Sequence, residues 1–279
     1  MRCLVRDASK LQEADGLETV EADLGEPDSL EPALEGVSEV YYLVHSMEPG
    51  VEGGFAERDR QAAQNFCEIA ASCGVRRTIY LGGVTGSGEQ SEHLNSRNEV
   101  EEILRECSDE FVAIRATMIV GGGSASFGAL VQLVDRLPAL LLPAWRGNRV
   151  QPVAIDDVVA ALVAAREVAP GAYEIGGPDV LTFEEMTVAV ADLLGQAHRS
   201  LAVPFSSSKL EAAAASAVVD ADRELLEPLL EGLHEDLLVE NNALQAVFGV
   251  EPTAFVDAAR SALDTMDRQL KDASKHTDA

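Results

Sequence analysis

Short apolar stretches alternate with longer amphipathic segments over the first half of the chain. The short stretches are rich in β-branched and aromatic residues, as in Glu-Val-Tyr-Tyr-Leu-Val-His at residues 39–45. The longer segments carry apolar residues at helical spacing, as at residues 55–73, where the pattern ends at Gly74. This alternation predicts βαβ units and therefore an α/β fold with a parallel sheet. Strands are predicted at residues 3–5, 18–22, 39–45, 77–81 and 111–115, and helices at residues 28–34, 55–73 and 96–107.

The pattern changes after Gly121. A loop rich in Gly and Ser at residues 121–126 is placed to frame a pocket. Further along, Thr182-Phe-Glu-Glu has the pattern of a capping box at a helix start. From residue 206 onward the chain is acidic and helical, with no further strand predicted. The other elements predicted here are a helix at residues 126–137, an extended segment at 149–155 followed by a helix to 166, a strand at 172–175 and a helix at 182–194.

The charge is strongly acidic, with a net value of −27 and only four lysines. Such a surface argues against nucleic acid and anionic membranes as partners, because both present negative phosphates. The acidic residues are dispersed, which suits a protein kept soluble in concentrated salt; the alternative is an ordinary acidic protein. No apolar run is long enough to cross a bilayer, and the N-terminus has no signal-peptide pattern. We therefore expect a cytoplasmic protein, in a high-salt cytosol, without membrane insertion.

The four cysteines are Cys3, Cys67, Cys73 and Cys107. They form no Cys-x-x-Cys pair and have no histidine cluster beside them. Buried free thiols are therefore favoured over a metal site or a catalytic cysteine.

Candidate ligand-binding residues follow the strands, because a doubly wound sheet binds its ligand across the carboxyl ends of its strands. Arg6 follows the first strand, where a guanidinium pairs with the 2′-phosphate of NADP, so NADP(H) is favoured over NAD(H). The alternative is a strand-end arginine paired with Asp7.

Two further strand ends carry candidates. After the second strand, Asp23 is placed to accept from the adenine amino group while Leu24 packs on the ring; alternatively Asp23 is a turn residue. After the third strand, Val44 and His45 lie where the backbone passes the cofactor ribose; alternatively His45 is a hydrogen-bonded strand-end residue.

The order of LVRD, EADL, VYYLVHSM, RRTIYLGGV, HLNSRNEVEEIL, RATMIVGGGSASF, QPVAIDDVVAALV and YEIGGPDVLTFEEM resembles the atypical short-chain dehydrogenase/reductase superfamily. The resemblance is greatest to its NmrA-like, complex I accessory-subunit-like NAD(P)H-binding branch, also described as nucleoside-diphosphate-sugar epimerase-like, and covers about residues 2–194. It implies a Rossmann-type doubly wound parallel sheet and a small, mainly helical C-terminal lobe. The expected division is an NAD(P)-binding core at residues 1–120, mixed core and substrate-lobe segments at 121–205 and an acidic helical region at 206–279.

The chain departs from the family pattern at its start. The family begins with a strand and a Gly-x-x-Gly-x-x-Gly loop, which holds the pyrophosphate at a helix N-terminus. This sequence opens on the counterpart of the family's second strand. The first strand and the phosphate loop are thus expected to be missing, and cofactor binding by this chain is expected to be weak or absent.

A second departure concerns the family's Tyr-x-x-x-Lys pair and upstream serine. His93 stands at the tyrosine position, Arg97 at the lysine position, and the serine position falls on Gly82 or Gly83. A histidine can donate a proton near neutral pH, and Arg97 can bind the ribose hydroxyls without titrating. The alternatives are a surface histidine near a helix start and, for Ser91, Ser96 and Arg97, helix caps.

The sequence therefore favours an NADP(H)-dependent reductase or dehydrogenase of a small carbonyl or quinone-like substrate. The alternative is a non-catalytic NAD(P)-binding sensor or respiratory-complex accessory protein. A sugar-nucleotide epimerase ranks lowest, because it needs the same tyrosine and lysine. The substrate is not identified, and the C-terminal helices are the expected surface for a second copy or a protein partner.

Overall fold

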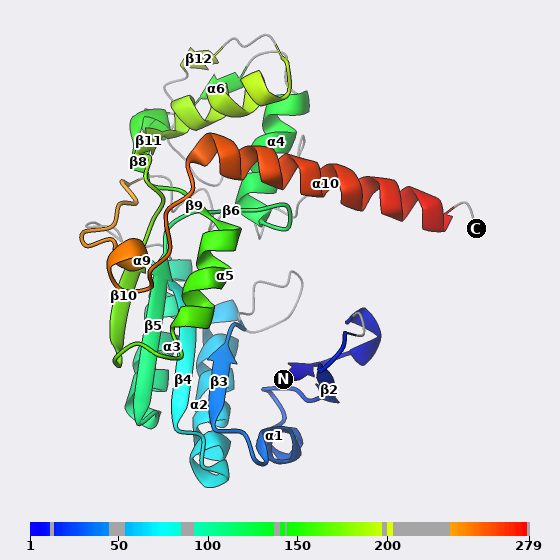
Figure 1. Ribbon diagram of the computed structural model, residues 1–279, viewed down its shortest axis with the longest axis vertical. Coiled ribbons are helices and arrows are strands. Elements are labelled where there is room, and N and C mark those ends of the chain that lie inside the picture. Colours follow the sequence, from blue (N-terminus) through cyan, green and yellow to red (C-terminus); the bar gives the residue numbers. More distant parts are fainter. Residues whose placement is uncertain are drawn as a thin grey trace. The chain divides into compact units, whose positions relative to one another are not determined.

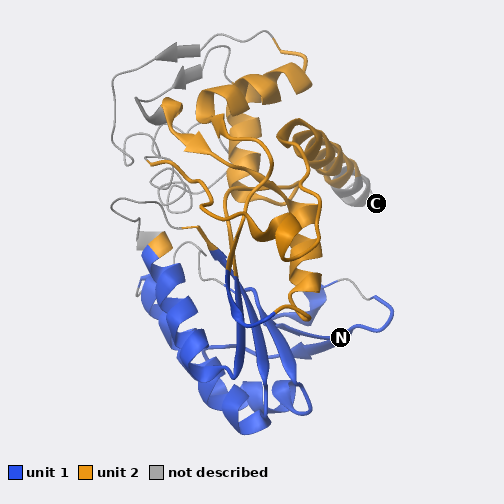
Figure 2. Cartoon of the chain, turned by 60° about the vertical axis from the view of Figure 1, so that its left-hand side comes forward, with its two compact units in different colours: residues 1–82, 95–113, 169–172 blue, residues 83–94, 114–168, 173–279 orange. Residues whose placement is uncertain are grey.

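The computed structural model describes residues 1–11, 14–44, 54–84, 92–136, 140–142, 144–196, 200–202 and 235–277 (Figure 1). The chain forms two compact units, shown in different colours in Figure 2. Unit 1 comprises Met1–Gly82, Asn95–Ala113 and Ala169–Ala172, and unit 2 comprises Gly83–Leu94, Ile114–Val168 and Tyr173–Ala279.

The strands are parallel wherever their pairing is resolved in unit 1. Strand β1 (Arg2–Val5) pairs with β2 (Glu18–Glu21), with Arg2 opposite Glu18. Strand β3 (Glu39–Tyr42) pairs with β4 (Arg77–Gly83), with Tyr42 opposite Tyr80. The latter two belong to a sheet of order β10-β5-β4-β3, which also contains β5 (Glu110–Ala116) and β10 (Gly171–Ile175). The predicted α/β fold with a parallel sheet is confirmed.

Three helices accompany these strands: α1 (Pro27–Leu34), α2 (Phe55–Cys73) and α3 (Glu92–Cys107). Helix α2 has the predicted bounds and ends at Gly74, whose φ of +78° is left-handed. The apolar faces of these elements enclose a core that includes Leu34, Phe66, Tyr80 and Leu104.

Helices α2 and α3 are joined by a disulfide between Cys67 and Cys107, whose Cα atoms are 5.6 Å apart. The prediction of free thiols is therefore wrong for these two cysteines, while Cys3 and Cys73 are free. The pair is separated by 40 residues. Only the packing of the two helices brings it together, so no local spacing could indicate it.

Unit 2 is built around three helices, α4 (Ala125–Arg136), α6 (Phe183–Leu193) and α10 (Phe255–Thr277). Their apolar faces meet in one core, with Phe127, Met186 and Phe255 at its centre. The predicted capping box at Thr182 is confirmed: Glu185 N donates to Thr182 Oγ1 at 3.1 Å, and Thr182 N donates to Glu185 Oε2 at 2.8 Å.

Short strands and helices complete unit 2. Strand β6 (Ile119–Val120) pairs in parallel with β9 (Val153–Ala154), β8 (Arg149–Val150) is antiparallel to β11 (Leu181–Thr182), and β12 (Ser200–Ala202) is parallel to β7 (Leu140–Leu142). The remaining described elements of unit 2 are helices α5 (Ile155–Ala164) and α9 (Ala243–Ala246) and the 3-10 helix η2 (Ala144–Gly147). A second 3-10 helix, η1 (Ala8–Lys10), belongs to unit 1.

Several predicted bounds are corrected. Strand β3 ends at Tyr42 rather than at residue 45, and β4 continues through Gly83. Helix α3 begins at Glu92, so Ser96 and Arg97 are interior residues and do not cap it, while Ser91 lies outside the described part of the chain. The Ser96 side chain is buried, unlike that of a helix cap at the surface.

The acidic C-terminal region is described in part. Residues 206–234 lie outside the described part of the chain, and the described remainder contains α9 and α10.

Candidate cofactor site

The carboxyl ends of β1 and β2 carry Arg6 and Asp23. Arg6 is exposed directly after β1, and the neighbouring Asp7 caps η1 by accepting from Ser9 N at 3.0 Å and from Ser9 Oγ at 2.6 Å. Asp23 Oδ1 accepts from Gly25 N at 2.8 Å. This carboxylate therefore shapes the turn after β2, which was the alternative prediction for Asp23.

The segment after β2 is anchored from α2. Asn65 is buried, and its Nδ2 donates to Leu24 O at 2.6 Å. The Leu24 side chain packs against the core of unit 1. The turn that carries Asp23 is therefore held in place by both a hydrogen bond and apolar contact.

At the end of β3, the adjacent residues Leu43 and Val44 are 49% and 50% exposed. These are large apolar side chains at a strand end, in the position where a ligand across the sheet would meet them. His45, the next residue, lies outside the described part of the chain.

At the end of β4, Gly82 is required by packing. A Cβ atom at this position would lie 2.9 Å from Tyr80 Cε1, because residues two apart on a strand share one face. The aromatic ring thus occupies the space where the family's serine side chain would begin. At Gly83, a Cβ atom would lie 3.2 Å from the flexible end of Leu94, a milder restriction.

A buried polar cluster links β4, α2 and α3. Tyr80 OH donates to the carbonyl oxygen of Arg97 at 3.0 Å, and Ser96 Oγ donates to Asp59 Oδ2 at 3.3 Å. Burial raises the pKa of Tyr80 to about 12, although the positive charge of Arg97 opposes the shift. Burial, and then the charge of Asp59, raise the pKa of Tyr42 still further. Both phenols are therefore neutral at neutral pH, and neither is a tyrosinate base.

His93 and Arg97 lie four residues apart in α3, which places them one turn apart on the same face. Arg97 is partly buried, whereas the side chain of His93 lies outside what the structure describes. Helix and strand thus bring Arg97, Tyr80 and Gly82 together, while the catalytic role of His93 stays a prediction.

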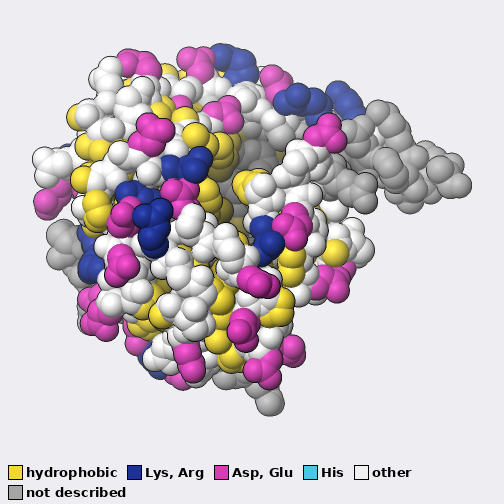
Figure 3. Space-filling view, turned by 60° about the horizontal axis from the view of Figure 1, so that its bottom comes forward, with side chains coloured by type: hydrophobic (Ala, Val, Ile, Leu, Met, Phe, Trp, Pro, Cys, Tyr) yellow, Lys and Arg dark blue, Asp and Glu magenta, His cyan; other side chains and the backbone are white. Residues whose placement is uncertain are grey.

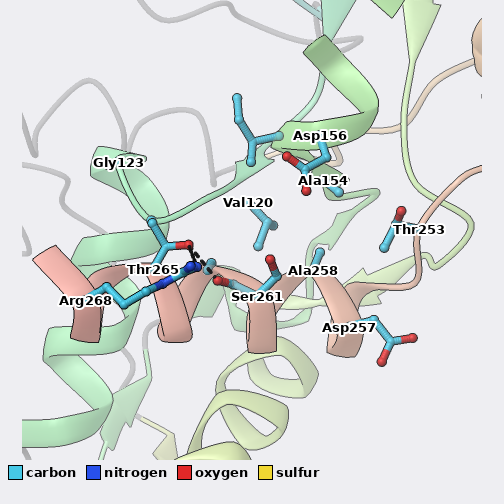
Figure 4. Close-up of a pocket in the computed structure, with 13 residues that line it drawn as sticks. Val120, Gly123, Ala154, Asp156, Thr253, Asp257, Ala258, Ser261, Thr265 and Arg268 are labelled. Carbon is cyan, nitrogen blue, oxygen red and sulfur yellow. Dashed lines mark hydrogen bonds between the residues drawn. The ribbon is translucent and has the colours of Figure 1, made fainter. Parts of the chain in front are cut away.

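A cavity in unit 2 was indicated in the sequence only by the Gly-Ser loop. Its volume is about 420 Å³, and it is lined by Gly122 and Gly123, the start of α5 and one face of α10 (Figure 4). A Cβ atom on Gly122 would lie 2.7 Å from Thr265, so the loop packs directly on α10. Arg268 is held against its own helix, donating from Nε to Asp264 O at 3.1 Å and from Nη2 to Thr265 Oγ1 at 3.1 Å.

Charges on the described surface are mixed. Figure 3 shows Asp and Glu side chains dispersed among Lys and Arg. Several basic residues are paired with acids, including Arg77 with Glu110 and Arg149 with Asp236, both at 2.6 Å. Among the described helices, none is long and apolar enough to cross a membrane.

Comparison with known proteins defines the class. Residues 1–119 match a family model described as NAD(P)H-binding. A mitochondrial subunit of NADH dehydrogenase (1 alpha subcomplex subunit 9) from Arabidopsis thaliana is 25% identical over 236 residues, covering 80% of this chain. The chain spans 59% of the length of that relative.

Solved structures share the fold over nearly the whole chain. A nucleoside-diphosphate-sugar epimerase from Staphylococcus aureus has a TM-score of 0.75 at 15% identity, covering 93% of this chain and 90% of its own. An NADPH-dependent quinone oxidoreductase from Escherichia coli, complexed with NADPH, has 0.74 at 18% identity, covering 92% and 88%. A triphenylmethane reductase from Citrobacter sp., complexed with NADP(H), has 0.72 at 18% identity, covering 94% and 90%.

These findings confirm the resemblance at two levels. The fold is the Rossmann-like α/β fold that these solved epimerase and oxidoreductase structures share. More particularly, residues 1–119 match an NAD(P)H-binding domain, and this span contains every residue predicted to contact the cofactor.

Proposed function

We propose that this protein binds NADP(H) at the carboxyl ends of the strands of unit 1 and reduces a small carbonyl or quinone-like substrate. The observation that carries the proposal is the NAD(P)H-binding match over residues 1–119. The substrate class is supported by solved neighbours that are a quinone oxidoreductase and a triphenylmethane reductase. The nicotinamide, when bound, supplies a hydride.

The chemistry of the strand-end residues fits a phosphorylated dinucleotide. Arg6 is exposed after β1 and suits a 2′-phosphate. Asp23 uses Oδ1 for its turn, which leaves Oδ2 to accept from an adenine amino group.

The ends of the third and fourth strands are assigned to the cofactor ribose. Leu43 and Val44 offer exposed apolar surface, with His45 next in the chain, and Arg97 suits the ribose hydroxyls. Gly82 and Gly83 are included as the residues at the end of β4, although the Tyr80 ring fills the space beside Gly82 and Leu94 lies close to Gly83.

His93 is assigned the proton transfer. Both buried phenols stay neutral, so a family-type tyrosinate is not supplied by Tyr42 or Tyr80. An imidazole titrates near neutral pH and can protonate the substrate oxygen as the hydride arrives. We expect His93→Gln to lower kcat about a hundredfold or more while leaving nucleotide affinity nearly unchanged.

The binding test compares NADPH with NADH by isothermal titration calorimetry in high salt. Arg6→Gln should weaken NADPH binding by about tenfold or more, since it removes a charge-assisted pairing, and leave NADH binding unchanged. The matched control is Arg76→Gln: Arg76 is also an exposed arginine of unit 1, but it precedes β4 at the amino end of the strand. Equal loss in both variants would contradict the role of Arg6.

The catalytic test follows NADPH oxidation across a panel of carbonyls and quinones. Turnover that is lost in His93→Gln supports the reductase. Tight nucleotide binding without turnover would instead support the second candidate, a non-catalytic NAD(P)-binding accessory protein. That candidate is favoured by the likeness to a complex I subunit over 80% of the chain. A melting temperature unmoved by NADPH and by NADH would contradict both.

A further inference from the structure

Tyr80 connects the sheet of unit 1 to the segment of α3 that carries Arg97. Its ring lies on the same face of β4 as Gly82, and only a glycine there leaves room for the ring. The side chain is fully buried, and its hydroxyl donates to Arg97 O at 3.0 Å. The phenol stays a donor at neutral pH, because burial raises its pKa to about 12.

Ser96, the residue of α3 that precedes Arg97, is bonded to a different element. Ser96 Oγ donates to Asp59 Oδ2 at 3.3 Å, and both residues are buried, with 2% and 5% exposure. Two successive residues of α3 are thus bonded to two different elements, β4 through Tyr80 and α2 through Asp59. Such bonds restrict both the rotation and the sliding of the helix at this turn.

We propose that Tyr80 is a positioning residue for Arg97, and that Gly82 is glycine so that Tyr80 can take this position. This inference rests on the proposed function, in which Arg97 binds the cofactor ribose. An arginine side chain has many rotamers, so its placement depends on the backbone from which it starts. Fixing residues 96 and 97 to the sheet lowers the cost of bringing the guanidinium to its ligand.

The chain offers a matched control in Tyr42. Tyr42 lies directly opposite Tyr80 on the neighbouring strand and is 4% exposed, and the two ring centroids are 6.3 Å apart. The Tyr42 ring also packs on Phe66, at 5.3 Å between centroids. The bond to the Arg97 carbonyl, however, comes from Tyr80. Replacing each tyrosine by phenylalanine removes one hydroxyl from the same core, but only one of the two changes loses that bond.

The experiment measures NADPH affinity by titration calorimetry in the full chain. Tyr80→Phe should weaken binding about fivefold, the equivalent of one hydrogen bond, and Tyr42→Phe should leave it within about twofold of the unchanged protein. Gly82→Ala should lower the melting temperature, because the added Cβ atom would collide with the Tyr80 ring. Melting temperatures of all variants establish that each is folded.

A double-mutant cycle separates positioning from a general structural effect. In an Arg97→Gln background the loss caused by Tyr80→Phe should vanish, because there is no guanidinium left to position. A loss that persists in that background, or that Tyr42→Phe shares, overturns the inference while leaving the proposed function intact. If the unchanged protein binds no NADPH, the proposed function fails, and the inference fails with it.

Discussion

At the scale of single residues, several glycines are required by their neighbours rather than by a turn. Gly82, Gly122 and Gly177 all lack a left-handed φ, but a Cβ atom at each would collide with a nearby atom. The tightest is Gly177, where a Cβ atom would lie 2.1 Å from Pro152 O. Gly177 N also donates to that oxygen at 3.0 Å, so the two backbones are in direct contact. A sequence shows such glycines but not the reason for them.

We expect Gly177→Ala to lower the free energy of unfolding by about 3 kcal/mol or more, because the backbone of Pro152 cannot yield as a flexible side chain would. Gly128→Ala is the matched control. Gly128 lies inside α4 with open space around it, and alanine there should raise the free energy of unfolding by about 1 kcal/mol. Guanidinium unfolding at constant salt measures both. A neutral Gly177→Ala would contradict the described contact.

Asp236 gives a prediction on pH. Its pKa is lowered first by the backbone N–H of Arg149, which donates at 2.7 Å, and then by the Arg149 guanidinium. A carboxylate whose pKa is lowered by folding stabilises the folded protein at pH values above its ordinary pKa of 3.8. This stabilisation is lost as the pH falls from 3.8 through the lowered pKa of the folded state.

Asp236→Asn should therefore lower the melting temperature slightly at pH 6, with the difference shrinking toward pH 3. The Arg149 side chain is 56% exposed and that of Asp236 is 37% exposed, so solvent screens the pair and the effect is small. The matched control is Asp267→Asn, which replaces an exposed aspartate on α10; a difference of the same size and pH dependence in that variant would count against the pairing. A constant difference between pH 6 and pH 3 would count against the pairing.

At the scale of elements, the disulfide between α2 and α3 adds a constraint to the core of unit 1. It closes a segment of 40 residues, for which chain entropy in the unfolded state corresponds to about 4 kcal/mol. The same two helices carry Asp59 and Ser96, whose hydrogen bond is a second link between α2 and α3.

Cys67→Ser combined with Cys107→Ser should lower the free energy of unfolding by about 2–4 kcal/mol. Thiol titration of the denatured, unreduced protein should find the two free cysteines, Cys3 and Cys73, and full reduction should expose all four. Cys3→Ser combined with Cys73→Ser is the control and should change stability little. Four reactive thiols before reduction would contradict the disulfide.

At the scale of the whole molecule, a net charge of −27 opposes compaction through self-repulsion. Salt screens this repulsion, since the Debye length falls from about 10 Å at 0.1 M to about 3 Å at 1 M. We expect the melting temperature to rise by several degrees between 0.1 M and 2 M KCl. Sucrose at equal osmolality serves as the control for solvent exclusion, and a rise as large in sucrose as in KCl would refute screening as the cause.

Much of the fold could be predicted from the spacing of apolar residues over short stretches of the chain. The bounds of α2 were predicted in full, and β1, β2 and β5 to within one residue at either end, since apolar spacing and a C-terminal glycine act over a few neighbouring positions. The short pairs β6 with β9 and β7 with β12 join segments far apart in sequence and have too few residues to show a period. The predicted start of α3 was four residues too late, because its first turn is mostly polar. The buried positions at helical spacing, Ser96, Val100 and Leu104, begin only after that turn.

The sequence by itself determined the fold class, the likeness of residues 1–119 to an NAD(P)H-binding domain and the acidic net charge, because each depends on residue type, order and spacing along the chain. Only the tertiary structure decided which distant residues meet. It joined Cys67 to Cys107, placed the ring of Tyr80 over Gly82, and bonded the Tyr80 hydroxyl to Arg97. The physical reason is that these contacts are made by side chains from different helices and strands. Their distances are fixed by how whole elements pack, and no local pattern records them.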